Sequence, residues 1–423
     1  MSTEFHQPAP GSAAVVGSDA GHGPTDPVSR NWIALFGLVW FGYWTANLVP
    51  LQLLLPQQLE LIDPASKVQS FAVVNAVSGL VAVVALPVCG ALCDRSRSRF
   101  GRRRIWLVGG ALFFAAGLVV TGEETTVTGV TAAWSASMLG LSAATAGLTA
   151  MIADQVPVDQ RGLVSSAIYG PQALGVMVGI AIVSAFALPP SDGYIVIAAL
   201  LLACALPFLM CFRDPAYSPE PPLSLGALVR SMGSSLRNRE FAWAFGGRLL
   251  VNLANSLGTC YTLYFLSDAL KVPDPAGSLL ACTALYLLAG ILATSVAGVL
   301  SDRLGRRRIF VALAALLQAV SGFLLAGFPN LTVTLVASAL MGGGFGAYMA
   351  VDQALITQVL PDAESRAQDL GIMNIGTLVP PALAPLIASF IITSNRGYPL
   401  LFSCVGAIAA VGVVLVYRVR SVR

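Results

Sequence analysis

Two ionisable residues lie inside long apolar stretches, where they could handle a proton or a charged solute. Asp352 is the only acidic residue placed well inside such a stretch, and Arg248 lies at a similar depth in another. Ionisable groups in apolar segments are costly and usually functional. Both histidines, His6 and His22, precede the first apolar stretch, so a proton crossing the apolar part needs a carboxylate. We predict that Asp352 takes up or senses a proton and that Arg248 is its counter-charge.

Arg248 begins a polar stripe. Asn252, Asn255 and Thr259 follow at four, seven and eleven residues, which places them on one helical face. Such a stripe suits the wall of a polar cavity. Arg248 then either lowers the proton affinity of Asp352 or binds an anionic or hydroxylated solute. The alternative is a static ion pair that fixes helix packing.

Another apolar stretch carries aromatic rings beside an amide: Trp40, Tyr43, Trp44 and Asn47. This combination suits the apolar faces and hydroxyl groups of a sugar, although packing in the protein core explains it equally well. Gln172 and Asn374 occupy matching apolar stretches of the two halves of the chain and are weaker candidates for a substrate cavity, because each can instead bond a backbone carbonyl.

The composition identifies the elements that must position these residues. Apolar residues make up 56% of the chain and charged residues 11%, whereas a soluble domain carries about 25% charged residues. About 20 apolar residues span a bilayer as a helix. We therefore predict an all-α integral membrane protein of twelve transmembrane helices: 31–55, 70–93, 105–121, 126–152, 163–188, 193–212, 241–267, 277–300, 309–327, 331–357, 368–393 and 398–417. The seven cysteines lack metal-ligand spacing, so we expect no metal and no cofactor.

The chain divides at two polar segments. Residues 1–30 are rich in Gly, Pro and Ser and predict a disordered cytoplasmic tail. Residues 213–240 predict a cytoplasmic linker between six-helix bundles at 31–212 and 241–423, the latter ending in a short tail. Most Lys and Arg residues fall in alternate loops, which predicts cytoplasmic termini. A multi-pass protein with short loops suits a bacterial inner (plasma) membrane.

The two halves repeat one loop motif. The sequence Gly-Ala-Leu-Cys-Asp-Arg at 90–95 corresponds to Gly-Val-Leu-Ser-Asp-Arg at 298–303. Gly-Arg-Arg-Arg follows each copy, at 101–104 and 305–308. A duplicated six-helix unit is the architecture in which a substrate site forms between two rocking bundles.

This repeated loop resembles the signature loop of the major facilitator superfamily, and the resemblance covers everything after the N-terminal tail. The extended first copy, 94–104, is similar to the loop of glycoside–cation and sucrose–proton symporters. The resemblance implies two pseudo-symmetric six-helix bundles and solute transport by alternating access, with no enzymatic activity.

The resemblance also implies gating roles at the loop ends. Gly90 and Gly298 would let neighbouring helices approach closely. Asp94 and Asp302, at the ends of helices whose dipoles disfavour them, would bind a partner from the opposite half. The remaining predicted gating residues are Arg95, Gly101, Arg102, Asp154, Arg161, Arg303, Gly305, Arg306, Glu364 and Arg366. For Arg97, Arg99, Arg103, Arg104, Arg307 and Arg308 we expect only topology and headgroup contacts.

Two directions of transport fit this pattern. We favour proton-coupled symport of a sugar-like or other small polar solute, and the alternative is proton-coupled efflux of a drug-like or secreted metabolite. Proton–drug antiporters of the family usually have an arginine in the fourth span and a Gly-Pro-x-x-Gly-Gly stretch in the fifth. This sequence has neither, which argues against efflux. A membrane enzyme would need grouped catalytic residues, and a receptor derived from a transporter would have lost Asp352. The expected partners are a small solute and the lipid bilayer, with no nucleic acid, and the expected state is a monomer.

Overall fold

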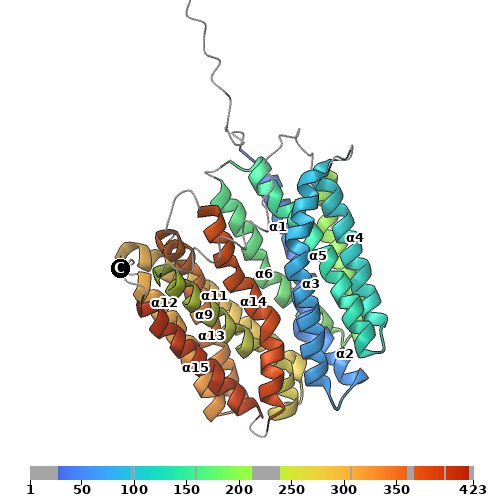
Figure 1. Ribbon diagram of the computed structural model, residues 1–423. Coiled ribbons are helices and arrows are strands. Elements are labelled where there is room, and N and C mark those ends of the chain that lie inside the picture. The colour runs from blue at the N-terminus through green and yellow to red at the C-terminus, as the bar shows by residue number, and fades with distance from the viewer. Residues whose placement is uncertain are drawn as a thin grey trace, which may run out of the picture.

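The computed structural model describes residues 27–96, 98, 101–157, 160–211, 239–304, 307–359, 366–394 and 397–418, and every regular element in them is a helix (Figure 1). The first half contains α1 (Arg30–Val49), α2 (Leu55–Ile62), α3 (Lys67–Arg95), α4 (Arg102–Glu123), α5 (Val127–Gln155), α6 (Arg161–Ala185) and α7 (Pro190–Cys211). The second half contains α9 (Arg239–Thr259), α10 (Thr262–Tyr264), α11 (Pro275–Leu304), α12 (Arg307–Gly327), α13 (Leu331–Val359), α14 (Arg366–Ile392) and α15 (Gly397–Arg418).

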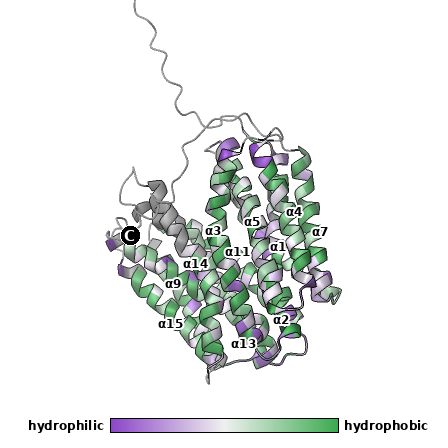
Figure 2. Ribbon diagram, turned by 45° about the vertical axis from the view of Figure 1, so that its right-hand side comes forward, coloured by the Kyte–Doolittle hydropathy of each residue, from purple (hydrophilic) through white to green (hydrophobic). Residues whose placement is uncertain are grey.

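The helices have the length and composition of membrane spans. Ten helical segments of the described chain are long and apolar enough to cross a bilayer. The apolar parts of α6 and α14 are shorter, at Gly170–Ala185 and Val379–Ile392. Hydrophobic residues run along the helices and hydrophilic residues gather at their ends (Figure 2). The all-α membrane fold is confirmed, while a count of twelve spans depends on these two shorter stretches.

The first span is longer than its predicted range, 31–55. It continues through a π-helical turn, Pro50–Leu54, into α2 and ends at Ile62. Pro50 has no N–H to donate, and its carbonyl accepts the N–H of Leu55 five residues later. The corresponding span of the second half is interrupted in the same region, since α9 is followed by α10 and by the π-helical turn Phe265–Ala269.

Helix packing repeats between the two halves. In the first half α1 packs on α6 and α7, and α5 packs on α3 and α4. The corresponding helices of the second half pack in the same way: α9 on α14 and α15, and α13 on α11 and α12. This repeated packing is the pseudo-symmetric arrangement that the duplicated loop motif predicts. The residue boundaries of the two domains stay a prediction, because 212–238 lies outside the described residues.

The halves meet along two helix pairs, α3 with α14 and α6 with α11. In Figure 1 the orange-red α14 stands beside the blue α3. At Gly79 of α3 an added Cβ would lie 2.8 Å from the Cβ of Ala382 in α14. Only a residue without a side chain fits this crossing point.

Candidate functional site

Arg248 and Asp352 form an ion pair inside the second half. Arg248 lies on α9 and Asp352 on α13, and the Nη1 of Arg248 donates to the Oδ2 of Asp352. They are 3% and 4% exposed. The structure thus brings together the two charges that the sequence placed at similar depths. Their role in proton coupling stays a prediction.

A third helix holds the arginine in place. The Nε of Arg248 donates to the Oγ1 of Thr377 on α14 over 2.9 Å. A Cβ on the neighbouring Gly376 would lie 3.5 Å from the Cγ and Cδ of Arg248, in ordinary contact. Sequence reasoning missed Thr377, because a single threonine among apolar residues carries no signal. Arg248 therefore links α9, α13 and α14.

The predicted polar stripe on α9 makes hydrogen bonds within the second half, and its place in a cavity wall stays a prediction. Asn252 is buried and its Nδ2 donates to the backbone oxygen of Arg248 over 2.9 Å. The Oδ1 of Asn255 accepts from the hydroxyl of Tyr286 on α11 over 3.0 Å. Tyr348, one turn before Asp352 on α13, is buried, and its hydroxyl faces the side chains of Asp352 and Asn252. The hydroxyl therefore belongs to the surroundings of the ion pair.

The aromatic residues of α1 pack within the first half. Tyr43 is buried and stacks on Phe114 of α4, with ring centroids 6.1 Å apart. Trp40 is 5% exposed, and its ring lies 5.8 Å from that of Trp44. Trp44 donates from Nε1 to the backbone oxygen of Ile168 on α6 over 2.8 Å. These contacts match the core-packing alternative for Tyr43 and tie Trp44 to α6.

Three further residues were predicted to line the substrate cavity. Asn47 and Gln172 are half-buried on α1 and α6. Asn374 lies on α14, but its side chain is outside the described residues. Their place in a substrate cavity stays a prediction.

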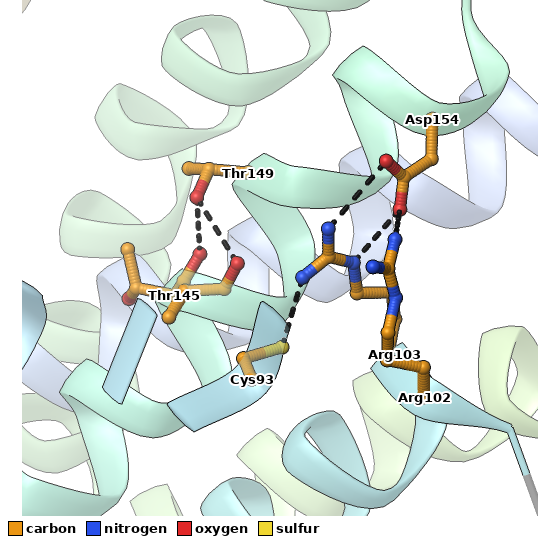
Figure 3. Close-up of polar contacts among 7 residues, drawn as sticks. Cys93, Arg102, Arg103, Thr145, Thr149 and Asp154 are labelled. Carbon is orange, nitrogen blue, oxygen red and sulfur yellow. Dashed lines mark hydrogen bonds and ion pairs between the residues drawn. The ribbon is translucent and has the colours of Figure 1, made fainter. Parts of the chain in front are cut away.

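Asp154, near the end of α5, binds two arginines at the start of α4 (Figure 3). Its Oδ2 accepts from the Nη2 of Arg102 at 3.0 Å and from the Nε of Arg103 at 2.8 Å. Arg103 also donates from Nη1 to the Sγ of Cys93 over 3.2 Å. The cluster therefore joins α3, α4 and α5 within the first half.

The expectation for one arginine of this loop was wrong. Arg103 is 5% exposed and bound to Asp154, whereas we expected it only to set topology. A helix start directs consecutive residues to different sides, so the arginine that faces the interior depends on how α4 is rotated. At Gly90 an added Cβ would meet no described atom within 4 Å, so the close helix approach expected there stays a prediction. At Gly298 the nearest atom would be 3.9 Å away, an ordinary contact.

Gly101 has a clear structural reason. It precedes α4 with φ 102° and ψ 141°, a backbone conformation that residues with a Cβ rarely adopt. Arg95 and Arg303 are exposed at the ends of α3 and α11. The side chains of Asp94, Arg161, Asp302 and Arg366, and the whole of Gly305, Arg306 and Glu364, lie outside the described residues.

Sequence reasoning missed a second set of contacts, which lies at the opposite end of the helices. Lys67 begins α3 in the first half. Its Nζ lies 2.7 Å from Glu60 of its own half and 2.7 Å from Asp268 of the second half. It also lies 4.9 Å from the ring centroid of Tyr264. The chain has only two lysines, and this rarity is the feature of the sequence that could have drawn attention to Lys67.

Tyrosine hydroxyls add further bonds between the halves at this end. Tyr264 donates to the backbone oxygen of Pro56 over 2.9 Å. The hydroxyl of Tyr261 lies 2.9 Å from the oxygen of Val68 and 3.0 Å from that of Pro385. The π-helical turn at Phe265–Ala269 carries Asp268 toward the first half. The halves are thus joined at the end away from the termini.

Known structures share this arrangement. The crystal structure of the nucleoside transporter NupG superposes with a TM-score of 0.74 at 14% identity, covering 92% of this chain and 99% of that one. A peptide transporter POT superposes with a TM-score of 0.71 at 13% identity, covering 95% and 98%. At such identities the likeness establishes the fold alone.

Sequence comparison gives the family. A "Probable 4-methylmuconolactone transporter" from Cupriavidus pinatubonensis is 39% identical over 97 residues, which is 23% of this chain and 22% of that protein. The sequence pattern of the Major Facilitator Superfamily matches residues 32–276 and 257–423, almost the whole described chain. With the helical fold and its repeated packing, this match shows that the chain is a membrane transporter belonging to the Major Facilitator Superfamily.

Proposed function

We propose that this protein couples the movement of a small polar solute to protons, by alternating access, with Asp352 as the proton-binding group. The observation that carries the proposal is the buried Arg248–Asp352 pair. A buried carboxylate beside an arginine has two states of very different interaction energy, because protonation removes the attraction between the two charges.

Protonation would therefore change how three helices are held together. In the ion pair, Arg248 of α9 holds Asp352 of α13 while Thr377 of α14 holds Arg248. Once Asp352 is neutral, α13 is released from the charge on α9, and the guanidinium can bind a solute. The proton and the solute then act on the same contact, which is the requirement for coupling.

In the proposed mechanism the two halves move relative to each other. We propose that both termini lie in the cytoplasm, because the arginine-rich loops lie at that end. The contacts around Lys67 would then close the outer side. Transport requires these contacts to break when the protein opens outward.

The test uses purified protein in liposomes with an imposed pH gradient. Sugars, glycosides, nucleosides, hydrophobic drugs and 4-methylmuconolactone are screened for accumulation. Uptake toward the alkaline side supports symport, and accumulation on the acidic side supports efflux by antiport. Asp352→Asn should abolish accumulation driven by the gradient while leaving exchange of solute in place.

Asp192→Asn is the matched control, because Asp192 is an exposed carboxylate at the start of α7. If Asp352→Asn accumulates the solute as well as the unmodified protein, Asp352 does not carry the coupling proton and the proposal is wrong.

A further inference from the structure

We propose that the transported solute is an anion, with a carboxylate group that takes the place of Asp352 on Arg248 once Asp352 is protonated. The inference rests on the proposed function and adds the chemical class of the substrate. It follows from the charges that the membrane-spanning part of the protein contains.

The charge balance at the site is simple. Among the described residues, Arg248 and Asp352 are the only charged side chains well inside the spans, and together they are neutral. Two tyrosines belong to the surroundings of the pair. Tyr348 lies four residues before Asp352 on α13, and Tyr286 of α11 donates its hydroxyl to Asn255 on α9. The other charged residues in the helices and described turns of the second half lie at helix ends or between helices: Arg239, Glu240, Asp268, Lys271, Asp274, Asp302, Arg303, Arg307, Arg308, Arg366, Asp369 and Arg418.

Protonation of Asp352 breaks this balance. It leaves Arg248 as an unpaired positive charge about 13 Å from the start of α9, at 1.5 Å per residue. An unpaired arginine inside a membrane protein is strongly disfavoured. A neutral solute cannot restore the pairing, whereas a carboxylate can. A proton and a monoanion arriving together leave the charge of the site unchanged.

The local geometry suits the exchange. A guanidinium has five N–H donors in one plane and binds carboxylates in a bidentate manner. Thr377 accepts from the Nε of Arg248, so the plane of the guanidinium stays fixed when Asp352 leaves. The buried hydroxyl of Tyr348, which faces Asp352 and Asn252, can donate to an anion that binds at Arg248. Thr377 is thus a positioning residue, and Tyr348 a specificity residue.

Matched pairs of compounds test the idea by binding. Glucuronate and glucose, lactate and lactamide, and benzoate and benzamide are compared by the rise in unfolding temperature of the purified protein. At least one acid should stabilise the protein while its neutral partner does not. Because one proton binds with each anion, the apparent Kd should increase about tenfold for each unit by which the pH rises, over the range in which Asp352 is ionised in the free protein.

Two variants sharpen the test. Asp352→Asn mimics the protonated site, so it should bind the acid with little dependence on pH. Arg248→Gln should lose acid binding, and the exposed Arg30→Gln should behave as the unmodified protein. If Arg248→Gln fails to fold, the test rests on the pH dependence of acid binding. It should be strong in the unmodified protein and weak in Asp352→Asn, and equal dependence in both would contradict the inference.

Membrane current separates this inference from the proposed function. Proton-coupled uptake of a monoanion moves no net charge, whereas uptake of a neutral solute with one proton moves one positive charge. Suppose that a neutral solute accumulates with an inward current and that Asp352→Asn loses this current. The inference that the solute is an anion would then be wrong, and the proposed proton coupling would still hold. If no compound accumulates in response to a pH gradient, both proposals fail. Liposomes without protein correct for acids that cross the bilayer unaided.

Discussion

At the scale of single residues, the Arg248–Asp352 pair is the feature with the largest energetic consequence. Both side chains are almost fully buried, so each depends on the other for charge compensation. Removing one partner of a buried ion pair costs about 3–5 kcal/mol, whereas replacing both by apolar residues of similar size is often neutral. The pair is therefore a weak stabiliser overall but a strict requirement once one member is present.

The first prediction follows from that asymmetry. Arg248→Ala should lower the free energy of unfolding by about 3–5 kcal/mol, and Arg248→Met with Asp352→Leu should restore most of the loss. Thermal unfolding in detergent measures both. A double variant as unstable as the single one would show that the stability comes from other contacts of these side chains.

The second prediction concerns two glycines of the signature loop. Gly101 has a positive φ, so Gly101→Ala should destabilise the protein by about 1–2 kcal/mol. Gly90 is helical and an added Cβ meets no described atom, so Gly90→Ala should be neutral or stabilise by up to about 1 kcal/mol. Unfolding temperatures of the two variants, measured side by side, should shift in different directions. Equal losses would mean that Gly90 is closely packed after all.

At the scale of elements, Lys67 joins α3 to the second half by an ion pair. Lys67 binds Glu60, which stays with it in the first half, and Asp268, which belongs to the second half. In the proposed outward opening of the halves, Glu60 would still compensate the ammonium charge of Lys67. This arrangement lowers the cost of breaking the contact with Asp268.

The third prediction is that the two carboxylates act in opposite directions. Asp268→Asn should favour separation of the halves at this end, and Glu60→Gln should favour contact, because Lys67 then has only Asp268. The carboxylates of these pairs are open to solvent, and ion pairs near the surface contribute about 0.2–1 kcal/mol, so each population should change by roughly fivefold at most. Spin labels at the exposed Leu61 and at Pro273 would report the separation. Shifts in the same direction for both variants would refute this division of roles.

At the scale of the whole molecule, the two halves pack closely at Gly79 and Ala382. The distance from a Cβ on Gly79 to the Cβ of Ala382 would be 2.8 Å, which leaves no room for a side chain. The contact lies on the α3–α14 pair, one of the two helix pairs that join the halves. A larger residue there must push the halves apart.

The fourth prediction tests that contact. Gly79→Leu should destabilise the protein by about 1–3 kcal/mol through overpacking and should increase the distance between the halves. Gly109→Leu is the matched control, because an added Cβ on this exposed glycine of α4 meets no described atom. Thermal unfolding and the spin-label distance measure the two effects. Equal stability of the two variants would show that the halves adjust at no cost.

Much of this protein followed from its sequence. The apolar stretches located the helices to within a few residues, apart from the longer first span, because the cost of placing polar groups in lipid depends mainly on local composition. The repeated loop predicted the repeated packing. The depths of Arg248 and Asp352 could be counted along their helices, since the rise per residue is constant.

Only the tertiary structure decided which side chains meet. A residue's depth follows from counting, but the direction in which it points and its partner depend on how helices are rotated and packed. The sequence therefore could not show that Thr377 would hold Arg248, that Arg103 would face Asp154, or that Lys67 would reach Asp268 in the other half. These contacts join residues from 51 to 201 positions apart, and packing alone brings them together.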